Sequence, residues 1–275
     1  MIKCEILDKE FATELEMFKA LKANKATLTA QKKAQIKTKK NTSVLGFMDM
    51  KTKAVKGIPD MDDDHIYPII SNTNYLDGHK DVHMNQSMNR TAKNQNGKVY
   101  YVADHKLEVD SIIATPKNVE VMLVEMDWKD LGRNYEGKTE CLIFKIAKTD
   151  IMHEKFMKLI DKGESLQNSI RMQYVTLDMA INSQDSDFED EYKVYLEVYP
   201  TIANKGDFEE IHYFWAVREL KIFMEGSAVL FGSNDATPTK NDIADPPKGT
   251  QQEAEELAAK ALQESQQTFY KSILN

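Results

Sequence analysis

The chain has 275 residues, a hydrophobic fraction of 41% and a formal net charge of −8. This hydrophobic fraction is sufficient for a packed core, and the acidic balance argues against nucleic acid as a partner of the whole protein. No stretch approaches the roughly 18 apolar residues that span a membrane, so we expect no membrane contact, and the N-terminus lacks the basic-then-apolar layout of a secretory signal. The two cysteines, Cys4 and Cys141, provide no disulfide framework and suit a reducing cytosol.

The N-terminal segment, residues 1–43, is rich in lysine. Residues 1–8 predict a short strand, and Phe11, Leu15 and Phe18 recur at helical spacing behind Asp8, a candidate N-cap. Beyond residue 16 the acidic residues stop until residue 49, while eight lysines accumulate: Lys19, Lys22, Lys25, Lys32, Lys33, Lys37, Lys39 and Lys40. The pattern indicates either a pair of helices with lysine-covered, solvated faces or a docking surface for an acidic scaffold or capsid partner.

A strand is predicted at 65–70, after an acidic loop. The segment Tyr75–His83 follows, and if it is extended, its four alternate polar side chains project to one face: Asp77, His79, Asp81 and His83. Such a row could ligate a divalent metal ion. The alternative is a polar strand face or a loop beside an active site, and the absence of an H-E-x-x-H motif or a close cysteine pair favours this alternative.

The central part of the chain predicts many short strands and few helices. Strands are expected at 99–103, 111–114, 120–126, 139–147, 172–181, 192–199, 211–222 and 227–231. Apolar residues from Ile151 to Ile160 predict a helix that stops at Gly163. The loop 185–191 is acidic and expected to be solvated.

These elements predict an α+β fold, built as a β-barrel or a strongly bent antiparallel sheet with surrounding helices. The main domain is expected at 44–232, after the N-terminal segment. The composition of 233–250 is typical of a flexible linker, and 251–275 predicts a C-terminal amphipathic helix.

Ser169 is the candidate nucleophile, because it lies where the helix before Gly163 is expected to hand over to a strand. Such transitions expose a side chain while holding its backbone still. A serine hydroxyl also needs a base, and His105, directly after the strand 99–103, has an imidazole that can accept and return a proton. A third group must orient the imidazole, and Glu225 is the first choice.

The third group has two alternatives, Glu219 and His212. A carboxylate is favoured over His212 because it stabilises an imidazolium more strongly. For the oxyanion, backbone N–H groups near Ser169 are expected, with Arg171 or Arg218 as possible helpers. Among the other histidines, His79 and His83 are only near-site candidates, and His65 and His153 are expected to be structural or exposed.

The order of these landmarks resembles the prohead serine proteases of tailed bacteriophages, which are distant relatives of the herpesvirus assemblins. The resemblance covers roughly residues 44–240. It rests on Tyr75–His83, Val102–His105, Gly163–Tyr174, Glu219–Val229 and Ser233–Ala236. The chain departs from the family pattern after the histidine, where Lys106 replaces an aspartate, and after Ser169, where Ile170-Arg171-Met172 replaces x-G-F.

The resemblance implies an assemblin-like fold and a serine endopeptidase with the catalytic residues Ser169, His105 and Glu225; in assemblins the third member is a histidine. It also implies a protease that needs no cofactor and no metal ion. Its expected partners are the major capsid protein and its scaffolding region, with the protease itself as a further substrate. Its expected place is the host cytoplasm, inside the assembling procapsid. The remaining hypotheses are a non-enzymatic capsid-assembly protein and a metal-dependent hydrolase.

Overall fold

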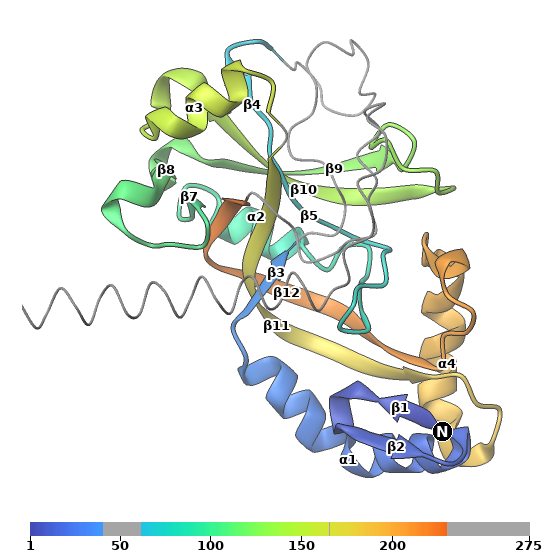
Figure 1. The fold of residues 1–275 in the computed structure, drawn as a ribbon. Helices are drawn as coiled ribbons and strands as arrows, with labels where there is room; N and C mark the ends of the chain where they lie inside the picture. The colour runs from blue at the N-terminus through green and yellow to red at the C-terminus, as the bar shows by residue number, and fades with distance from the viewer. Residues whose placement is uncertain (41–61, 165, 230–275) are drawn as a thin grey trace, which may run out of the picture. The chain divides into compact units, whose positions relative to one another are not determined.

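Two long antiparallel strands, β11 (Gln167–Ile181) and β12 (Tyr213–Val229), form the framework of the fold. The computed structural model describes residues 1–40, 62–164 and 166–229. The pairing of the two strands runs from Gln167 opposite Val229 to Ile181 opposite Tyr213. Figure 1 shows them side by side, with helices α1 and α4 near one end and a second sheet near the other.

The chain divides into two units, Met1–Thr237 and Pro238–Asn275, and only the first contains described residues. This first unit includes both the predicted N-terminal segment, 1–43, and the predicted body, 44–232. The predicted linker and C-terminal helix lie outside the described residues. Within the described ranges, no helix has the length and apolar character needed to cross a membrane.

The larger sheet has the strand order β3-β11-β12-β7-β8, with β6 also paired to β12. The strands that flank the central pair are β3 (Lys37–Lys40), β6 (Asp81–His83), β7 (Tyr100–Ala103) and β8 (Ile112–Ala114). Because β6 and β7 run parallel to β12, the sheet is mixed and not the antiparallel sheet that was predicted. The α+β class is confirmed, but across the described ranges the sheets do not close into a barrel.

The second sheet is centred on β10 (Lys138–Ala147), which forms a hairpin with β9 (Glu120–Asp127). On its other side β10 pairs with β4 (His65–Ile66) and β5 (Ile69–Asn72). The single strand predicted at 65–70 is therefore split in two. The split falls at Pro68, which has no N–H group to donate to a neighbouring strand.

The N-terminal helix α1 (Glu14–Ala34) begins later than predicted. Its N-cap is Thr13, whose hydroxyl accepts a hydrogen bond from the N–H of Glu16 at 3.3 Å. Asp8 instead has φ 50° at the end of a short 3-10 turn, between the paired strands β1 (Ile2–Cys4) and β2 (Lys9–Phe11). The predicted pair of helices is, as far as residue 40, one helix followed by β3.

The strand predicted at 192–199 is helix α4 (Glu189–Val198), so that prediction is wrong. Its alternating Tyr and Val residues have high β propensity, but the buried side chains are Glu191, Tyr195 and Val198. That spacing of four and three residues defines one face of a helix. Tertiary packing against the central strands therefore decides the structure of this segment over intrinsic propensity.

Helices α2 (Asn89–Gln95) and α3 (Glu154–Asp161) complete the helices of the described ranges. The sequence patterns predict no helix at α2, which has only two buried residues, Thr91 and Ala92. Helix α3 is the one predicted from its apolar stripe, and Gly163, with φ 72°, lies just beyond its end as predicted.

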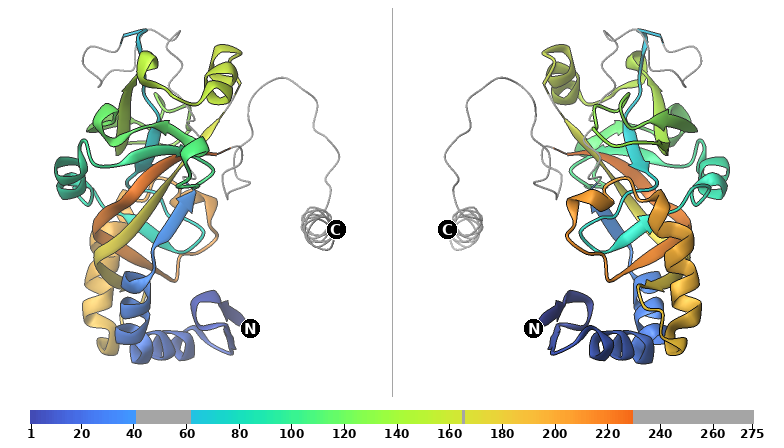
Figure 2. Two further views of the ribbon diagram at one scale, coloured as in Figure 1. Left: turned by 90° about the vertical axis from the view of Figure 1, so that its left-hand side faces the viewer. Right: turned by 90° about the vertical axis from the view of Figure 1, so that its right-hand side faces the viewer.

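Several of the N-terminal lysines form ion pairs inside this unit. Lys22 and Lys25 of α1 pair with Glu191 of α4, at 3.4 and 2.5 Å, which ties the two helices together. Figure 2 shows α1 and α4 lying next to each other. Lys32 and Lys37 both pair with Asp81 of β6. These four ammonium groups therefore hold α1 and β3 to the rest of the unit.

Candidate active site

Ser169 lies within β11 and not at a turn. It is paired on one side with Ser227 of β12 and on the other with Lys40 of β3, and it is fully buried. The predicted transition from helix to strand occurs earlier, between α3 and Gln167. The serine backbone is therefore held by neighbouring strands on both sides, which is a more rigid support than a turn.

His105 follows directly after β7, as predicted, and its backbone is unusual. Asp104 and His105 both have a left-handed conformation, with φ 52° and 58°. For a residue with a side chain this conformation costs roughly 1–2 kcal/mol. Hydrogen bonds hold it in place: the N–H of Asp104 donates to the carbonyl of Ala228 at 2.9 Å, and the N–H of His105 donates to the Ser227 hydroxyl at 2.8 Å. Backbone strain that is maintained in this way is typical of functional sites.

The imidazole of His105 bridges the serine and the glutamate. Its Nε2 lies 2.6 Å from Oγ of Ser169, and its Nδ1 lies 2.8 Å from Oε1 of Glu225. An ionised carboxylate can only accept hydrogen bonds, so Nδ1 must carry the proton that points to Glu225. Nε2 is then left as an acceptor for the Ser169 hydroxyl. The structure thus brings together the three predicted side chains, from β11, from β12 and from the turn that follows β7.

Glu225 reaches the imidazole because of a bulge in β12. The pairs Ile170–Gly226 and Met172–Ile222 leave Phe223, Met224 and Glu225 opposite Arg171 alone. Within the bulge, Met224 has a left-handed backbone conformation, with φ 69°. A bulge redirects the side chains of a strand, and such features occur often beside active sites.

Arg171 completes the surroundings of Glu225. Its Nε lies 3.3 Å from Oε1 of Glu225, and its terminal nitrogen donates to the carbonyl of His105 at 3.2 Å. The second oxygen, Oε2 of Glu225, is buried and has no hydrogen-bond partner among the described residues. A buried carboxylate with one unsatisfied oxygen costs free energy, which indicates that the group is kept for a role other than stability.

Gly226 allows β12 to pack closely at this point. A Cβ atom at Gly226 would lie 2.7 Å from Cε2 of Phe144 and 3.0 Å from Cγ2 of Ile70. Both side chains are fully buried in the core. The glycine between Glu225 and Ser227 therefore presses the site against the second sheet, and any side chain there would push the two apart.

The alternative site residues lie elsewhere. Glu219 of β12 forms an ion pair with Arg90 at 3.2 Å. In the sheet it is opposite Thr176 of β11. His212 precedes β12 at the far end from Ser227, where its Nδ1 lies 3.3 Å from Glu14 and 3.7 Å from Glu210. Neither residue has a described contact with His105.

Of the two proposed arginine helpers, Arg218 is bound to Asp178 and Glu197. Arg171 is at the site, but its guanidinium is engaged by Glu225 and by the carbonyl of His105. Its position indicates support of the imidazole and not binding of an oxyanion.

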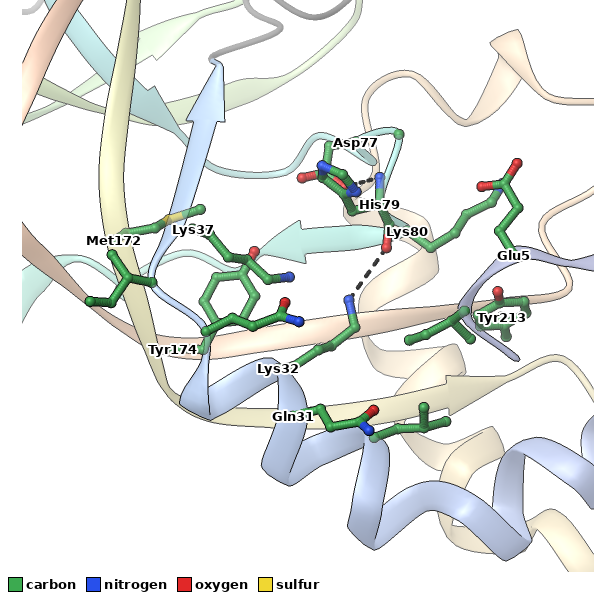
Figure 3. Close-up of a pocket in the computed structure, with 15 residues that line it drawn as sticks. Glu5, Gln31, Lys32, Lys37, Asp77, His79, Lys80, Met172, Tyr174 and Tyr213 are labelled. Carbon is green, nitrogen blue, oxygen red and sulfur yellow. Dashed lines mark hydrogen bonds between the residues drawn. The ribbon is translucent and has the colours of Figure 1, made fainter. Parts of the chain in front are cut away.

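The row of possible metal ligands at Asp77, His79, Asp81 and His83 does not lie on one strand. Residues 77–80 make a turn in which Oδ1 of Asp77 accepts the N–H groups of His79 and Asp81, both at 2.9 Å. The turn lines a pocket together with Lys32 of α1, which donates to the carbonyl of His79 at 3.4 Å (Figure 3). His83 is buried, with its ring against Tyr174. Asp77 and His79 belong to the turn, whereas Asp81 and His83 lie on β6 and both contact Tyr174. Among the described residues, the ligand atoms of these four side chains do not gather into a metal-binding group.

Asp81 is the centre of a structural ion-pair network. It accepts hydrogen bonds from Lys32, from Lys37 at 2.9 Å and from the hydroxyl of Tyr174 at 2.8 Å. Burial opposes ionisation of this carboxyl, but the ammonium groups of Lys32 and Lys37 outweigh it and lower the pKa of Asp81 to about 2. Burial also lowers the pKa of Lys32 and raises the pKa of Tyr174 well above its usual value. Two ammonium groups on one carboxylate are incompatible with a cation at the same oxygens.

The other histidines and the cysteine of β10 that could have taken part in chemistry have structural roles. His153 caps α3, where its Nδ1 accepts the N–H of Phe156 at 3.0 Å, and His65 pairs with Asp62 at 2.6 Å. Cys141 is buried in β10, and burial raises the pKa of its thiol to about 12. A thiol of this kind is protonated at neutral pH and is not a nucleophile.

Sequence reasoning missed the supporting roles of two residues. Ser227 accepts the N–H of His105 and donates to the carbonyl of Val102 at 3.1 Å. The sequence suggests Arg171 only as a helper for the oxyanion. The available signal was the alternation of a strand: Arg171 is two residues from Ser169, so it shares the face of the nucleophile. Ser227 is likewise two residues from Glu225, although the local bulge makes that spacing less informative.

Comparison of the chain with protein-family models, with curated proteins and with solved structures gave no match. The resemblance to prohead proteases therefore rests on the order of short motifs and stays a prediction. The spatial arrangement of Ser169, His105 and Glu225 is independent of that resemblance.

Proposed function

We propose that this protein is a serine endopeptidase with Ser169 as nucleophile, His105 as general base and acid, and Glu225 as the group that orients the imidazole. The observation that carries the proposal is the continuous hydrogen-bonded chain from Oγ of Ser169 through both nitrogens of His105 to Oε1 of Glu225. These side chains come from positions 169, 105 and 225, far apart in the sequence. Their convergence with one compatible pattern of protons supports a catalytic unit.

In the first half of the reaction, Nε2 of His105 takes the proton of the Ser169 hydroxyl while Oγ attacks the carbonyl carbon of the substrate. The carbonyl π electrons move to oxygen, and a tetrahedral intermediate forms. The imidazolium then gives its proton to the amine nitrogen as the peptide C–N bond breaks. This leaves an acyl ester on Ser169 and a free amine.

In the second half, water attacks the ester carbonyl as Nε2 of His105 accepts one of its protons. The second tetrahedral intermediate collapses, and the proton returns to Oγ of Ser169. Glu225 stays ionised and stabilises the imidazolium in both halves. Arg171 and Ser227 act through His105 as positioning residues, because they hold its carbonyl and its N–H.

Ser169 has no exposed surface, whereas the side chain of His105 is 14% exposed. Groups over the hydroxyl must therefore move before a substrate carbonyl reaches Oγ. The partial exposure of the imidazole indicates that the substrate enters from the side of His105.

The resemblance of the motif order, histidine then serine then glutamate, supports a role in procapsid maturation. The substrates would be extensions of the scaffold or of the major capsid protein, and the protease itself. The site of action would be the procapsid as it assembles in the host cytoplasm. This setting is a proposal separate from the chemistry of the site.

Covalent labelling of the full chain with a fluorophosphonate probe tests the chemistry. We expect the wild type to be labelled at Ser169 and the Ser169→Ala variant to be unlabelled. The Ser183→Ala variant is the matched control, because Ser183 lies outside the site, in the segment between β11 and α4. Loss of the capsid-protein cleavage with Ser169→Ala in coexpression tests the setting. A wild type that is never labelled would favour the non-enzymatic assembly protein.

A further inference from the structure

A groove of about 490 Å³ lies between α2 and the middle of β11 and β12. Its lining has three exposed cations, Arg90, Lys98 and Lys221, against the single carboxylate of Glu219. The other polar groups of the lining are uncharged. The groove therefore has a positive balance in a chain whose formal net charge is −8, and the catalytic chemistry described above uses none of these side chains.

The groove opens on the face of the sheet that carries the nucleophile. Ile170 and Tyr174 of β11 belong to the hydrophobic core on the other face. Because side chains alternate along a strand, Ser169 and Gln173 project away from that core. Gln173 is opposite Lys221 of β12, and directly opposite residues share a face. Lys221, which lines the groove, is therefore on the same face of the sheet as Ser169.

The separation of the groove from the nucleophile fits an extended peptide. Four residues separate Gln173 from Ser169, which at about 3.4 Å per residue is roughly 14 Å along the strand. Val175, which also lines the groove, is six residues from Ser169, or roughly 20 Å. An extended peptide covers these lengths with about four to six residues. The groove is thus too far away to contact the cut bond, but a longer substrate reaches it.

The charge of the lining selects the occupant. A carboxylate in the groove faces Arg90, Lys98 and Lys221, whereas a lysine or arginine side chain of the substrate is repelled by them. No aromatic side chain lines the described groove, so it has no platform on which the bases of a single-stranded nucleic acid could stack. These features favour an acidic peptide.

We infer that this basic groove is an exosite, a docking site remote from the cut bond, which binds an aspartate or glutamate of the peptide substrate about four to six residues from that bond. The inference rests on the proposed function, because it assigns a substrate feature to the same protease. Contacts this far from the reacting atoms are equally strong in the ground state and the transition state, so they lower KM and leave kcat unchanged. Because the cations are exposed, high ionic strength weakens the effect.

The first test needs no variant. The full-length protein is given a peptide mixture, and the cut positions are read by mass spectrometry. The fastest-cut sequence is then synthesised in two forms, with glutamate or with glutamine at each position about four to six residues from the cut. Exposed ion pairs contribute up to about fivefold each, so for one of these positions we expect KM to be about 10-fold lower for the glutamate form, with equal kcat. The difference should shrink in about 0.5 M salt.

The second test reverses charges in the groove. Lys98→Glu and Lys221→Glu are each expected to raise KM for the glutamate peptide by about fivefold or more, without changing kcat or the rate of fluorophosphonate labelling. Lys93→Glu is the matched control, because Lys93 is exposed on α2 and does not line the groove. Glu219→Gln removes the one carboxylate of the lining and should lower KM. Circular dichroism verifies the fold of each variant, and the peptide pair decides the inference if one does not fold.

The outcomes separate the exosite from the protease. If the wild type is labelled and cuts peptides, but the glutamate and glutamine peptides have equal KM, the exosite is overturned and the protease stands. The same conclusion follows if Lys98→Glu and Lys221→Glu behave like Lys93→Glu. Inhibition by a single-stranded oligonucleotide, together with equal KM for the two peptides, would assign the groove to nucleic acid instead. If the wild type is neither labelled nor active, the proposed function fails and the exosite falls with it.

Discussion

Replacing Glu225 by glutamine tests the central geometric claim with a side chain of nearly the same size that lacks the negative charge. The wild-type carboxylate lies 2.8 Å from Nδ1 of His105 and is fully buried. Two opposite charges about 4 Å apart attract each other by about 4 kcal/mol at an effective dielectric constant of about 20. The imidazolium that forms during attack loses this stabilisation in the variant. At about 1.4 kcal/mol for each factor of ten, we expect acylation of Ser169 to slow by about 10³-fold.

A second effect acts in the same direction. The amide of glutamine can present its NH₂ group to the imidazole, which favours the tautomer with the proton on Nε2. That tautomer cannot accept the serine proton, and replacing the carboxylate of a Ser-His-Asp triad by an amide lowers kcat by about 10⁴-fold. The expected loss for Glu225→Gln is therefore between about 10³- and 10⁴-fold.

The assay is the second-order rate of fluorophosphonate labelling, measured beside urea denaturation to verify the fold. Glu219→Gln is the matched control, because Glu219 is on the same strand and pairs with Arg90 away from the histidine. Labelling of Glu225→Gln within about threefold of the wild type, with the fold intact, would refute the role assigned to Glu225. A large loss in Glu219→Gln would move that role to the control residue.

Three further changes are expected to have distinct effects. Arg171→Met removes the contacts of the guanidinium with Glu225 and with the His105 carbonyl. A shift of about 1 Å in a catalytic group can lower the rate by about 10²-fold, so we expect kcat to fall by up to that factor with KM unchanged. Arg171→Lys or added guanidinium should restore part of the lost rate. Gly226→Ala forces a Cβ atom to within 2.7 Å of Phe144, so urea denaturation should show a loss of about 1–3 kcal/mol. Asp81→Asn leaves two lysines without their shared carboxylate, and a loss of about 3–5 kcal/mol in the free energy of unfolding is expected.

The Asp81 network also predicts how stability depends on pH. The pKa of this carboxyl is lowered from 3.8 to about 2 in the folded protein. A lowered pKa means that the folded state favours the charged form, so the stabilisation is complete above about pH 4 and is lost as the pH falls toward about 2. The contribution is about 2 kcal/mol at 1.36 kcal/mol per pKa unit. Urea denaturation between pH 5 and about 2 should show a steeper loss for the wild type than for Asp81→Asn, and equal slopes would contradict the network.

Short-range sequence patterns were sufficient to predict those elements whose structure does not depend on distant contacts. The strands β7, β9 and β10 and the helix α3 with Gly163 behind it are predictable from apolar spacing and turn residues. His105 could be placed after a strand for the same reason. The prediction for residues 192–199 is wrong, because their tyrosines and valines suit a strand while the packing of Tyr195 and Val198 required a helix.

The sequence favoured Glu225 as the third group, but the geometry that separates Glu225 from Glu219 could not be read from it. Glu219 and Glu225 are six residues apart on β12 and would share a face in a regular strand. The register pairs Ser227 with Ser169, and the bulge at Phe223–Glu225 turns one of the two carboxylates to His105. His212 is less favoured by residue type, because a carboxylate stabilises an imidazolium more strongly, and it lies beyond the other end of the strand. Register and bulge are properties of pairing between distant segments, so no local pattern encodes them.

The amino-acid sequence by itself determined which residue types could perform the chemistry and where the strands β7, β8, β9 and β10 lie, because these depend on side-chain chemistry and on short-range periodicity. Only the tertiary structure decided that β6 and β7 run parallel to β12, that Asp81 forms ion pairs with two lysines, and that Ser169, His105 and Glu225 meet. Each of these depends on contacts between residues far apart in the chain, and the free energy of such contacts comes from burial and pairing that exist only once the strands are assembled.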